Sequence, residues 1–95
     1  MSLTFEHDSS GHQFRALDEA SEVGRVEYDL DGTVATVTHT WTDPTHRGEG
    51  IAGKLTTVVL DEVRTRGWTV VPQCPYTARF LADHAEYQDL LYPAG

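Results

Sequence analysis

The spacing of apolar residues changes once along this 95-residue chain, and that change limits the folds open to it. Up to about residue 42, apolar and polar residues alternate with a period of two, as in strands of a half-buried sheet. From Gly50 to Gly67 the apolar residues recur at helical spacing and form one stripe, made of Ile51, Leu55, Val58, Val59 and Val63. A chain this short can bury only one core, so we expect residues 1–95 to form a single mixed domain.

A first hairpin is predicted near the N-terminus. Residues 3–7 alternate apolar and polar side chains, and the segment 8–11, Asp-Ser-Ser-Gly, has the composition of a turn. The alternation resumes at Phe14 and Ala16. We therefore expect these two segments to pair as antiparallel strands.

The second hairpin has a more specific turn, because Asp31 and Gly32 suit the positive φ angles of a two-residue type I′ loop. Such a loop sets which residues lie opposite each other, and here it brings apolar residues together on one side of the sheet. We expect this side to be covered and the other to contact water. The predicted pairs are Leu30 with Thr33, Tyr28 with Ala35, and Val26 with Val37.

The second half of the chain predicts a helix between two parallel strands. Gly67 is placed to end the main helix, and the apolar run at 68–71 is typical of a short strand that Pro72 ends. A further helix is expected to begin near Pro75. Because strand, helix and strand in this order imply a right-handed parallel crossover, the predicted fold is α/β (α+β), an antiparallel β-meander followed by a βαβ unit and a C-terminal helix.

Composition restricts the partners of the chain. The 15 Asp and Glu against 7 Lys and Arg give a formal net charge of −8, which opposes binding to nucleic acid or to an anionic membrane surface. The single Cys74 cannot form an internal disulfide, and we find neither an apolar run that could span a membrane nor a secretory signal, so we expect a cytoplasmic protein. The histidines lack metal-ligand spacing, so we predict no metal site. No feature indicates an oligomeric state.

The glycine-rich segment 47–54 lies where a predicted strand turns into the main helix. Glycines let backbone N–H groups approach a ligand closely, and a helix N-terminus adds unpaired donors and the positive end of a dipole. Two of the seven basic residues, Arg47 and Lys54, flank the segment, and His46 lies beside it. The segment is a predicted seat for phosphate or pyrophosphate, and the alternative is a tight turn that only closes against the sheet.

Two nucleotide-binding motifs fit this segment incompletely. The spacing of Gly48, Gly50 and Gly53 matches the dinucleotide-binding fingerprint, but residues 71–73 offer no acid to hold a ribose. A P-loop is disfavoured because Leu55 stands where a Ser or Thr hydroxyl must bind magnesium.

A third pattern, Arg47-x-x-Gly50-x-Ala52, is the pyrophosphate signature of the GNAT superfamily, the acetyl-CoA-dependent N-acetyltransferases. The chain resembles the small single-domain members of this group in four ordered segments that span about residues 7–91. They are 39–42 (His-Thr-Trp-Thr), 47–55 (Arg-Gly-Glu-Gly-Ile-Ala-Gly-Lys-Leu), 71–76 (Val-Pro-Gln-Cys-Pro-Tyr) and 84–87 (His-Ala-Glu-Tyr).

The resemblance implies a minimal GNAT-like fold, acetyl-CoA as cofactor and an amine as acceptor. Thr42 stands where the group usually has valine and Ala85 where it has proline, and the first departure bears on how the pantetheine arm lies along its strand. The cofactor-binding residues implied are Trp41, Thr42, Arg47, Gly48, Glu49, Gly50, Ile51, Ala52, Gly53 and Lys54.

Acetyl transfer needs a base for the amine, donors for an oxyanion and an acid for the departing thiolate, and three side chains are candidates. His39 is the candidate base, although the hairpin register places it on the face of Val37 and Trp41, where a partly buried histidine is expected. Cys74 would carry the acetyl group covalently or act only as a small apolar side chain. Tyr76 would protonate the thiolate or only pack against other aromatic rings.

The acceptor is expected to be large or cationic. A full GNAT domain has two helices between its first two strands, and here only residues 8–11 stand there, which would leave the acceptor side open. The net charge of −8 favours a cationic acceptor, such as a protein amine or a polyamine. The alternative is a regulatory module that binds CoA or acyl-CoA without turnover.

Overall fold

The computed structural model describes residues 2–46 and 48–93, so the predicted pyrophosphate-binding residue Arg47 lies outside the described residues. Five strands form one sheet in sequential order, with only the last pair parallel. The strands are β1 (Leu3–Asp8), β2 (Gln13–Asp18), β3 (Ser21–Asp31), β4 (Val34–Thr42) and β5 (Thr69–Pro72). The helices are α1 (Ile51–Thr65) and α2 (Pro75–Asp83), and two 3-10 turns accompany them, η1 (Pro44–His46) before α1 and η2 (Ala85–Leu90) after α2. The predicted fold class is confirmed.

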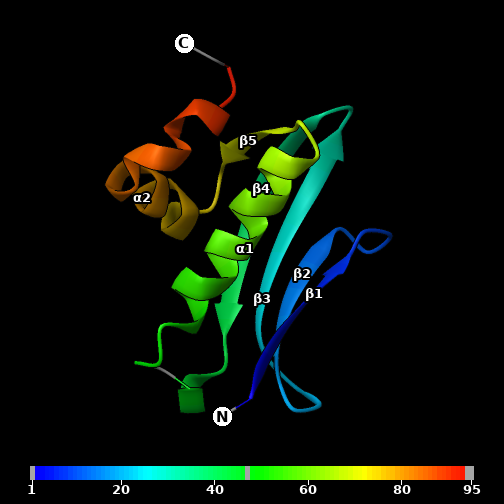
Figure 1. Ribbon diagram of the computed structural model, residues 1–95, viewed down its shortest axis with the longest axis vertical. Helices are drawn as coiled ribbons and strands as arrows, with labels where there is room; N and C mark the ends of the chain where they lie inside the picture. The colour runs from blue at the N-terminus through cyan, green and yellow to red at the C-terminus, as the bar shows by residue number, and fades with distance from the viewer. Residues whose placement is uncertain (1, 47, 94–95) are drawn as a thin grey trace.

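One face of the sheet carries the core. α1 lies across β2, β3 and β4, and α2 lies beside β4 and β5 (Figure 1). Complete burial of a side chain such as Leu55 or Phe14 stabilises the fold by about 1.5–3 kcal/mol. The apolar stripe of α1 meets inward side chains of β2, β3 and β4, and the shared core includes Phe14, Ala16, Val23, Val26, Tyr28, Ala35, Val37, Ile51, Leu55, Val59, Leu60 and Val63.

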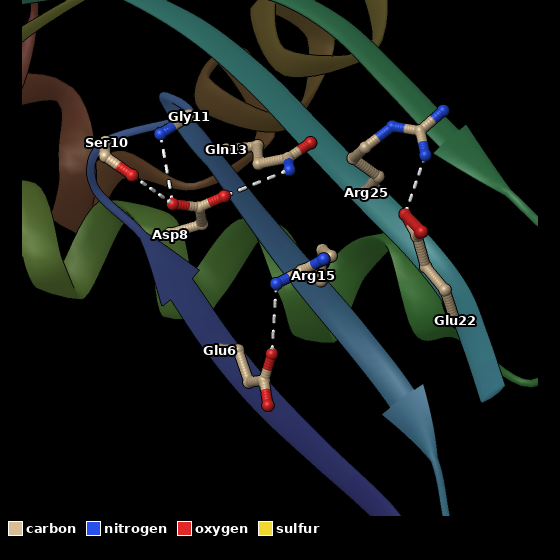
Figure 2. A network of polar contacts seen from close by, with 8 residues as sticks. All are labelled: Glu6, Asp8, Ser10, Gly11, Gln13, Arg15, Glu22 and Arg25. Carbon is tan, nitrogen blue, oxygen red and sulfur yellow. Dashed lines mark hydrogen bonds and ion pairs between the residues drawn. The ribbon is translucent and has the colours of Figure 1, made fainter. Parts of the chain in front are cut away.

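The opposite face of the sheet is polar and open, as expected. Figure 2 shows two ion pairs on this face, one between β1 and β2 and one within β3. Arg15 lies 3.3 Å from Glu6, and Arg25 lies 2.7 Å from Glu22 and 3.0 Å from Glu27. Among the described residues, these charged side chains stand where a second helical layer would otherwise pack.

The first hairpin forms as predicted, and its turn is held by a side chain. The Asp8 carboxylate accepts hydrogen bonds from the Gly11 N–H and the Ser10 hydroxyl, both at 3.0 Å, and from the Gln13 amide at 3.3 Å (Figure 2). These donors, led by the Gly11 N–H, hold the pKa of Asp8 below its usual value.

The predicted register of the second hairpin is wrong by two residues on β4, because the two-residue loop lies one residue further along the chain. Asp31 pairs with Val34, so the loop residues are Gly32, with φ 62°, and Thr33. Gly32 is therefore the first loop residue rather than the second, and since Thr33 does not have a positive φ, the predicted type I′ turn does not form. The pairs formed are Leu30 with Ala35 and Tyr28 with Val37, which still brings apolar residues together on the covered face.

A β-bulge in β4 reverses the predicted orientation of His39. Glu27 pairs with His39 but its neighbour Tyr28 pairs with Val37, so Thr38 is an extra residue on β4. The extra residue shifts the alternation, and His39 is exposed opposite Glu27 on the open face. The expectation that His39 shares a face with Val37 and is partly buried is therefore wrong.

The main helix ends as predicted. Gly67 has φ 72°, its N–H donates to the Arg64 carbonyl at 3.1 Å, and the Trp68 N–H donates to the Val63 carbonyl at 2.9 Å. This is the hydrogen-bond pattern of a Schellman motif, which requires the left-handed conformation that glycine adopts without strain. The stop directs the chain into β5.

β5 pairs with only the first part of β4. The parallel pairing ends at Val37 with Pro72, and one further bond joins the Cys74 N–H to the Val37 carbonyl at 2.9 Å. Within the described residues, β4 then continues to Thr42 without a β5 partner while the chain after Cys74 enters α2. The two segments separate beside the N-terminus of α1.

Candidate functional site

A cavity of about 460 Å³ lies at the N-terminus of α1. It extends from the end of β4 across the glycine-rich turn to the start of α2. Its lining residues are Thr42, His46, Gly48, Gly50, Ile51, Ala52, Gly53 and Tyr76. Six of the predicted cofactor-binding residues, Thr42, Gly48, Gly50, Ile51, Ala52 and Gly53, therefore lie around one cavity.

The turn that forms the cavity depends on two glycines in the left-handed region. Gly48 has φ 86°, and Gly50, the N-cap of α1, has φ 72°. A Cβ atom at either position would meet nothing within 4 Å, so the requirement is conformational rather than steric. The turn leaves the space in front of the helix clear.

The N-terminus of α1 offers free donors to this cavity. The helical bonding starts with the Lys54 N–H, which donates to the Gly50 carbonyl at 3.0 Å, so the N–H groups of the three residues before it lack helical partners. Among the described residues, no side chain caps this end and none in the first turn is acidic. Unpaired donors at the positive end of the helix dipole favour an anion such as pyrophosphate.

The other predicted binding residues lie away from the cavity lining. Glu49 and Lys54 are exposed beside the turn. Trp41 lies on the open face of the sheet, where the Arg25 guanidinium is 5.2 Å from the centre of its ring. The bulge in β4 is the reason, because it turns Trp41 away from α1 and leaves its neighbour Thr42 on the cavity side.

His46 is held at the cavity by two acids. Its Nε2 lies 3.4 Å from Asp18 and its Nδ1 lies 3.5 Å from Asp43. Asp43 also accepts the Thr45 N–H at 3.0 Å, which, with the Thr45 hydroxyl, keeps the pKa of Asp43 below its usual value. The turn η1 is therefore positioned by Asp18 of β2 and by Asp43, the residue that precedes it.

Sequence reasoning did not identify Gly24, which sets how closely α1 approaches the sheet. Gly24 pairs with Thr42, and a Cβ atom on it would lie 3.0 Å from Cγ2 of Ile51 and 3.5 Å from Leu55. A glycine inside a strand often marks close approach of another element, and this signal was present in the sequence.

Tyr76 is the titratable side chain of α2 that lines the cavity. Its hydroxyl oxygen would lie 3.6 Å from a Cβ atom on Gly53, so it faces the first turn of α1. Burial raises the pKa of Tyr76 although the residue is 40% exposed, so the hydroxyl keeps its proton at neutral pH. The ring also packs against Phe80, with centroids 6.4 Å apart.

Cys74, the N-cap of α2, lies close to Tyr76 in the chain but is buried, with 7% exposure. Its Sγ lies 3.5 Å from the Thr40 hydroxyl, and Cys74 is not among the described residues that line the cavity. Burial, the largest influence, raises the pKa of the thiol, but hydrogen bonding with Thr40, the N–H groups of Thr77 and Tyr76 and the nearby Thr77 side chain together lower it by more, so the net pKa is below its usual value.

The structure brings Cys74 and Tyr76 together and keeps His39 apart. Thr40, the partner of Cys74, pairs with the buried Val26 on the covered face, whereas His39 is exposed on the open face. The three candidate catalytic residues therefore lie on two sides of β4.

A second cavity, of about 370 Å³, adjoins the first and shares Gly53 and Tyr76 with it. Arg79 contributes a cation to its lining. The remaining lining residues are Phe80, Asp83 and His84.

Two other kinds of site are not seen in the described part of the chain. Within residues 2–46 and 48–93, no three His, Cys, Asp or Glu side chains gather as a metal site would require. No described helix has the length and apolar character needed to cross a membrane.

Known structures share this fold. A GCN5-like putative N-acetyltransferase from Staphylococcus aureus matches with a TM-score of 0.67 at 18% identity, over 99% of this chain and 90% of that one. The ribosomal-protein-S18-alanine N-acetyltransferase of Escherichia coli gives 0.62 at 19% identity, over 75% of this chain and 48% of that one. A GNAT acetyltransferase from Brucella melitensis in complex with acetyl-CoA matches with a TM-score of 0.58 at 19% identity, over 76% of this chain and 54% of that one.

The chain thus spans about half the length of the E. coli and Brucella proteins. No curated protein sequence matches it significantly. The family model for GCN5-related N-acetyl-transferases matches residues 13–90, which include the bulged strand β4, the glycine-rich turn and both helices. By this match and the shared fold, the chain belongs to the GCN5-related N-acetyltransferase family.

Proposed function

We propose that this protein is an N-acetyltransferase that uses acetyl-CoA to acetylate an amine. The observation that carries the proposal is the cavity at the uncapped N-terminus of α1, beside the point where β4 and β5 separate. Free N–H donors, glycines in the left-handed region and the absence of acids in the first described turn suit a pyrophosphate. Acetyl-CoA supplies the acetyl group as a thioester.

The residues that would hold acetyl-CoA lie along the two cavities. The N–H groups of Ile51, Ala52 and Gly53 would bind the pyrophosphate, with Lys54 beside them. Arg79 in the adjoining cavity would bind a further phosphate. Arg47 remains a proposed pyrophosphate ligand on the sequence motif alone, since it lies outside the described residues.

Two side chains are the proposed donor and acceptor of protons in the reaction. The Tyr76 hydroxyl carries a proton at neutral pH and faces the first turn of α1, which suits a proton donor. His39 is exposed on the open face of the sheet, where an acceptor amine can approach, which suits a base.

Cys74 leaves two routes open. In a direct route the amine takes the acetyl group and Cys74 has no chemical role. In a relayed route the Cys74 sulfur carries the acetyl group first. Cys74→Ala separates them, because it would abolish the relayed route and leave the direct route near wild-type rates.

We propose a cationic protein amine or polyamine as the acceptor. The open face of the sheet suits a large acceptor, and the net charge of −8 suits a cationic one. The E. coli relative is named for acetylating an alanine of a ribosomal protein, and another relative was solved with the aminoglycoside sisomicin. We place the reaction in the cytoplasm, since the lone Cys74 needs no oxidising compartment.

A second candidate is a module that binds CoA or acyl-CoA without turnover. The separation of His39 from Cys74 and Tyr76 on two sides of β4 favours it. Release of free CoA thiol from acetyl-CoA with a panel of amines decides between the two. Tight binding without release would establish the module.

Binding is tested by calorimetric titration with acetyl-CoA. Gly50→Ala should weaken affinity at least about tenfold, because a Cβ atom strains the left-handed turn that exposes the donors. Gly32→Ala is the matched control, since Gly32 also has positive φ and open space for a Cβ atom but lies in the distant β3-β4 loop. No binding by the wild type at millimolar acetyl-CoA would refute the proposal.

A further inference from the structure

The Thr77 hydroxyl is a buried polar group without a partner. Thr77 is only 2% exposed, and within the described part of the chain its Oγ1 makes no hydrogen bond. A buried hydroxyl left unpaired costs about 1–3 kcal/mol, so its presence calls for an explanation. Valine would fill the same space without this cost.

The group that Thr77 faces is the thiol of Cys74. Cys74 is the N-cap of α2 and Thr77 is the third residue of that helix, the position whose N–H an N-cap side chain faces, and both the N–H and the side chain of Thr77 lower the pKa of the thiol. On its other side, Cys74 Sγ lies 3.5 Å from the Thr40 hydroxyl. The sulfur therefore lies between threonine hydroxyls from β4 and α2.

The ionisation state of the sulfur decides whether Thr77 is satisfied. A thiol has one weak donor, which here points to Thr40, and its sulfur is a poor acceptor. A thiolate is a strong acceptor and can take hydrogen bonds from both hydroxyls and from the N–H groups of Tyr76 and Thr77. The largest influences on the thiol pKa are burial, which raises it, and these neutral donors, which together lower it.

We propose that Thr40 and Thr77 are positioning residues that hold Cys74 as a thiolate at the N-terminus of α2. The Thr77 hydroxyl, idle beside the neutral thiol, turns to donate to the sulfur when the proton leaves to solvent. The pocket is thereby built for a nucleophilic sulfur rather than for an inert buried cysteine. Use of this nucleophile in acyl transfer rests on the proposed function, whereas the state of the sulfur does not.

The test is a titration of the thiolate by its ultraviolet absorbance in protein free of acetyl-CoA, with Cys74→Ala as baseline. Thr77→Val should raise the midpoint by about one pH unit, a tenfold loss of thiolate at a given pH. Thr77→Ser keeps the hydroxyl and should restore the wild-type midpoint. Thr56→Val is the matched control, since Thr56 is equally buried but bonds the Ala52 carbonyl within α1.

An unchanged midpoint in Thr77→Val, or an equal rise in Thr56→Val, overturns the proposal. If circular dichroism shows that Thr77→Val does not fold, Thr40→Val replaces it as the test variant. A raised midpoint is then expected, and an unchanged midpoint would overturn the proposal. Because the titration contains no acetyl-CoA, its result is separate from that of the acetyl-transfer assay. A wild-type protein with the shifted thiol but no transfer would refute the proposed function alone.

Discussion

At the scale of single residues, the first turn of α2 combines two titratable groups with opposite tendencies. Burial raises the pKa of the Tyr76 hydroxyl and keeps it protonated. Burial also raises the pKa of the Cys74 thiol, but local hydrogen bonds lower that pKa by more. The two residues are separated only by Pro75, so the proposed proton donor and the proposed nucleophile lie at one helix N-terminus. Of these two residues, Tyr76 lines the cavity and Cys74 does not. We therefore expect loss of the Tyr76 hydroxyl to affect the proposed acetyl transfer directly.

Tyr76→Phe is predicted to lower kcat about 100-fold, the usual contribution of a positioned acid, with little change in KM for acetyl-CoA. The ring and its packing on Phe80 are kept, so only the proton donor is lost. Tyr92→Phe is the control, because Tyr92 is exposed and outside both cavities. Steady-state kinetics of CoA release measure both variants, and equal kcat values would remove Tyr76 from the mechanism.

At the scale of elements, the contact of α1 with β3 decides the shape of the cavity. Ile51 begins α1 and packs over Gly24, which pairs with Thr42 at the cavity wall. The N-terminus of α1 can therefore lie close to β3 because Gly24 has no side chain.

Gly24→Ala is predicted to destabilise the fold by about 1–3 kcal/mol, because the added methyl overpacks against Ile51. Urea unfolding measures the loss. In an Ile51→Ala background the same substitution should cost less, since the methyl then has room. An equal loss of unfolding free energy in both backgrounds would show that Ile51 of α1 does not limit the space at Gly24 of β3.

The first hairpin is joined to β3 by His7, whose neutral form is favoured in the folded protein. His7 Nε2 lies 2.6 Å from the Tyr28 hydroxyl, and its ring stacks on Phe14 with centroids 4.0 Å apart. Burial, and secondarily Arg66, lowers the pKa of His7 in the folded protein. The unfolded chain therefore binds a proton more readily than the folded one.

Stability should consequently fall as pH drops through the unfolded histidine pKa of about 6.5 toward the lower folded value. Thermal unfolding between about pH 7 and pH 5 measures this slope. His7→Phe keeps the stacking on Phe14 without a titrating group and should flatten the profile. A profile as steep as that of the wild type would assign the pH dependence to other groups.

At the scale of the whole molecule, one sheet and one layer of helices make a thin body of 39 × 29 × 19 Å. The face without helices carries the exposed His39 and the ion pairs of Arg15 and Arg25, which Figure 2 shows. The whole chain has a net charge of −8, so a cationic acceptor is drawn toward it over distances beyond direct contact.

The activity toward a peptide with several lysines should therefore fall as salt rises. Its kcat/KM should drop severalfold between about 0.01 and 0.15 M ionic strength, because the Debye length shortens from about 30 to 8 Å. A peptide with all but one lysine replaced by glutamine should show a much weaker dependence. Identical salt profiles for the two peptides would argue against electrostatic selection of the acceptor.

The sequence alone determined the order of the elements, both hairpins, the helix stop at Gly67 and the glycines of the cavity. These depend on residues close together in the chain, whose period, turn chemistry and φ preferences can be read directly. The resemblance in ordered motifs added the family, which the match over residues 13–90 bears out.

The tertiary structure alone decided which way the side chains of β4 face. The extra residue Thr38 reverses the alternation after Val37, so His39 and Trp41 turn to the open face while Thr40 turns to Cys74. A bulge arises from the pairing of two strands and not from the pattern within one. The same holds for Thr77 beside Cys74, since burial and a missing partner exist only once β4 and α2 are packed together.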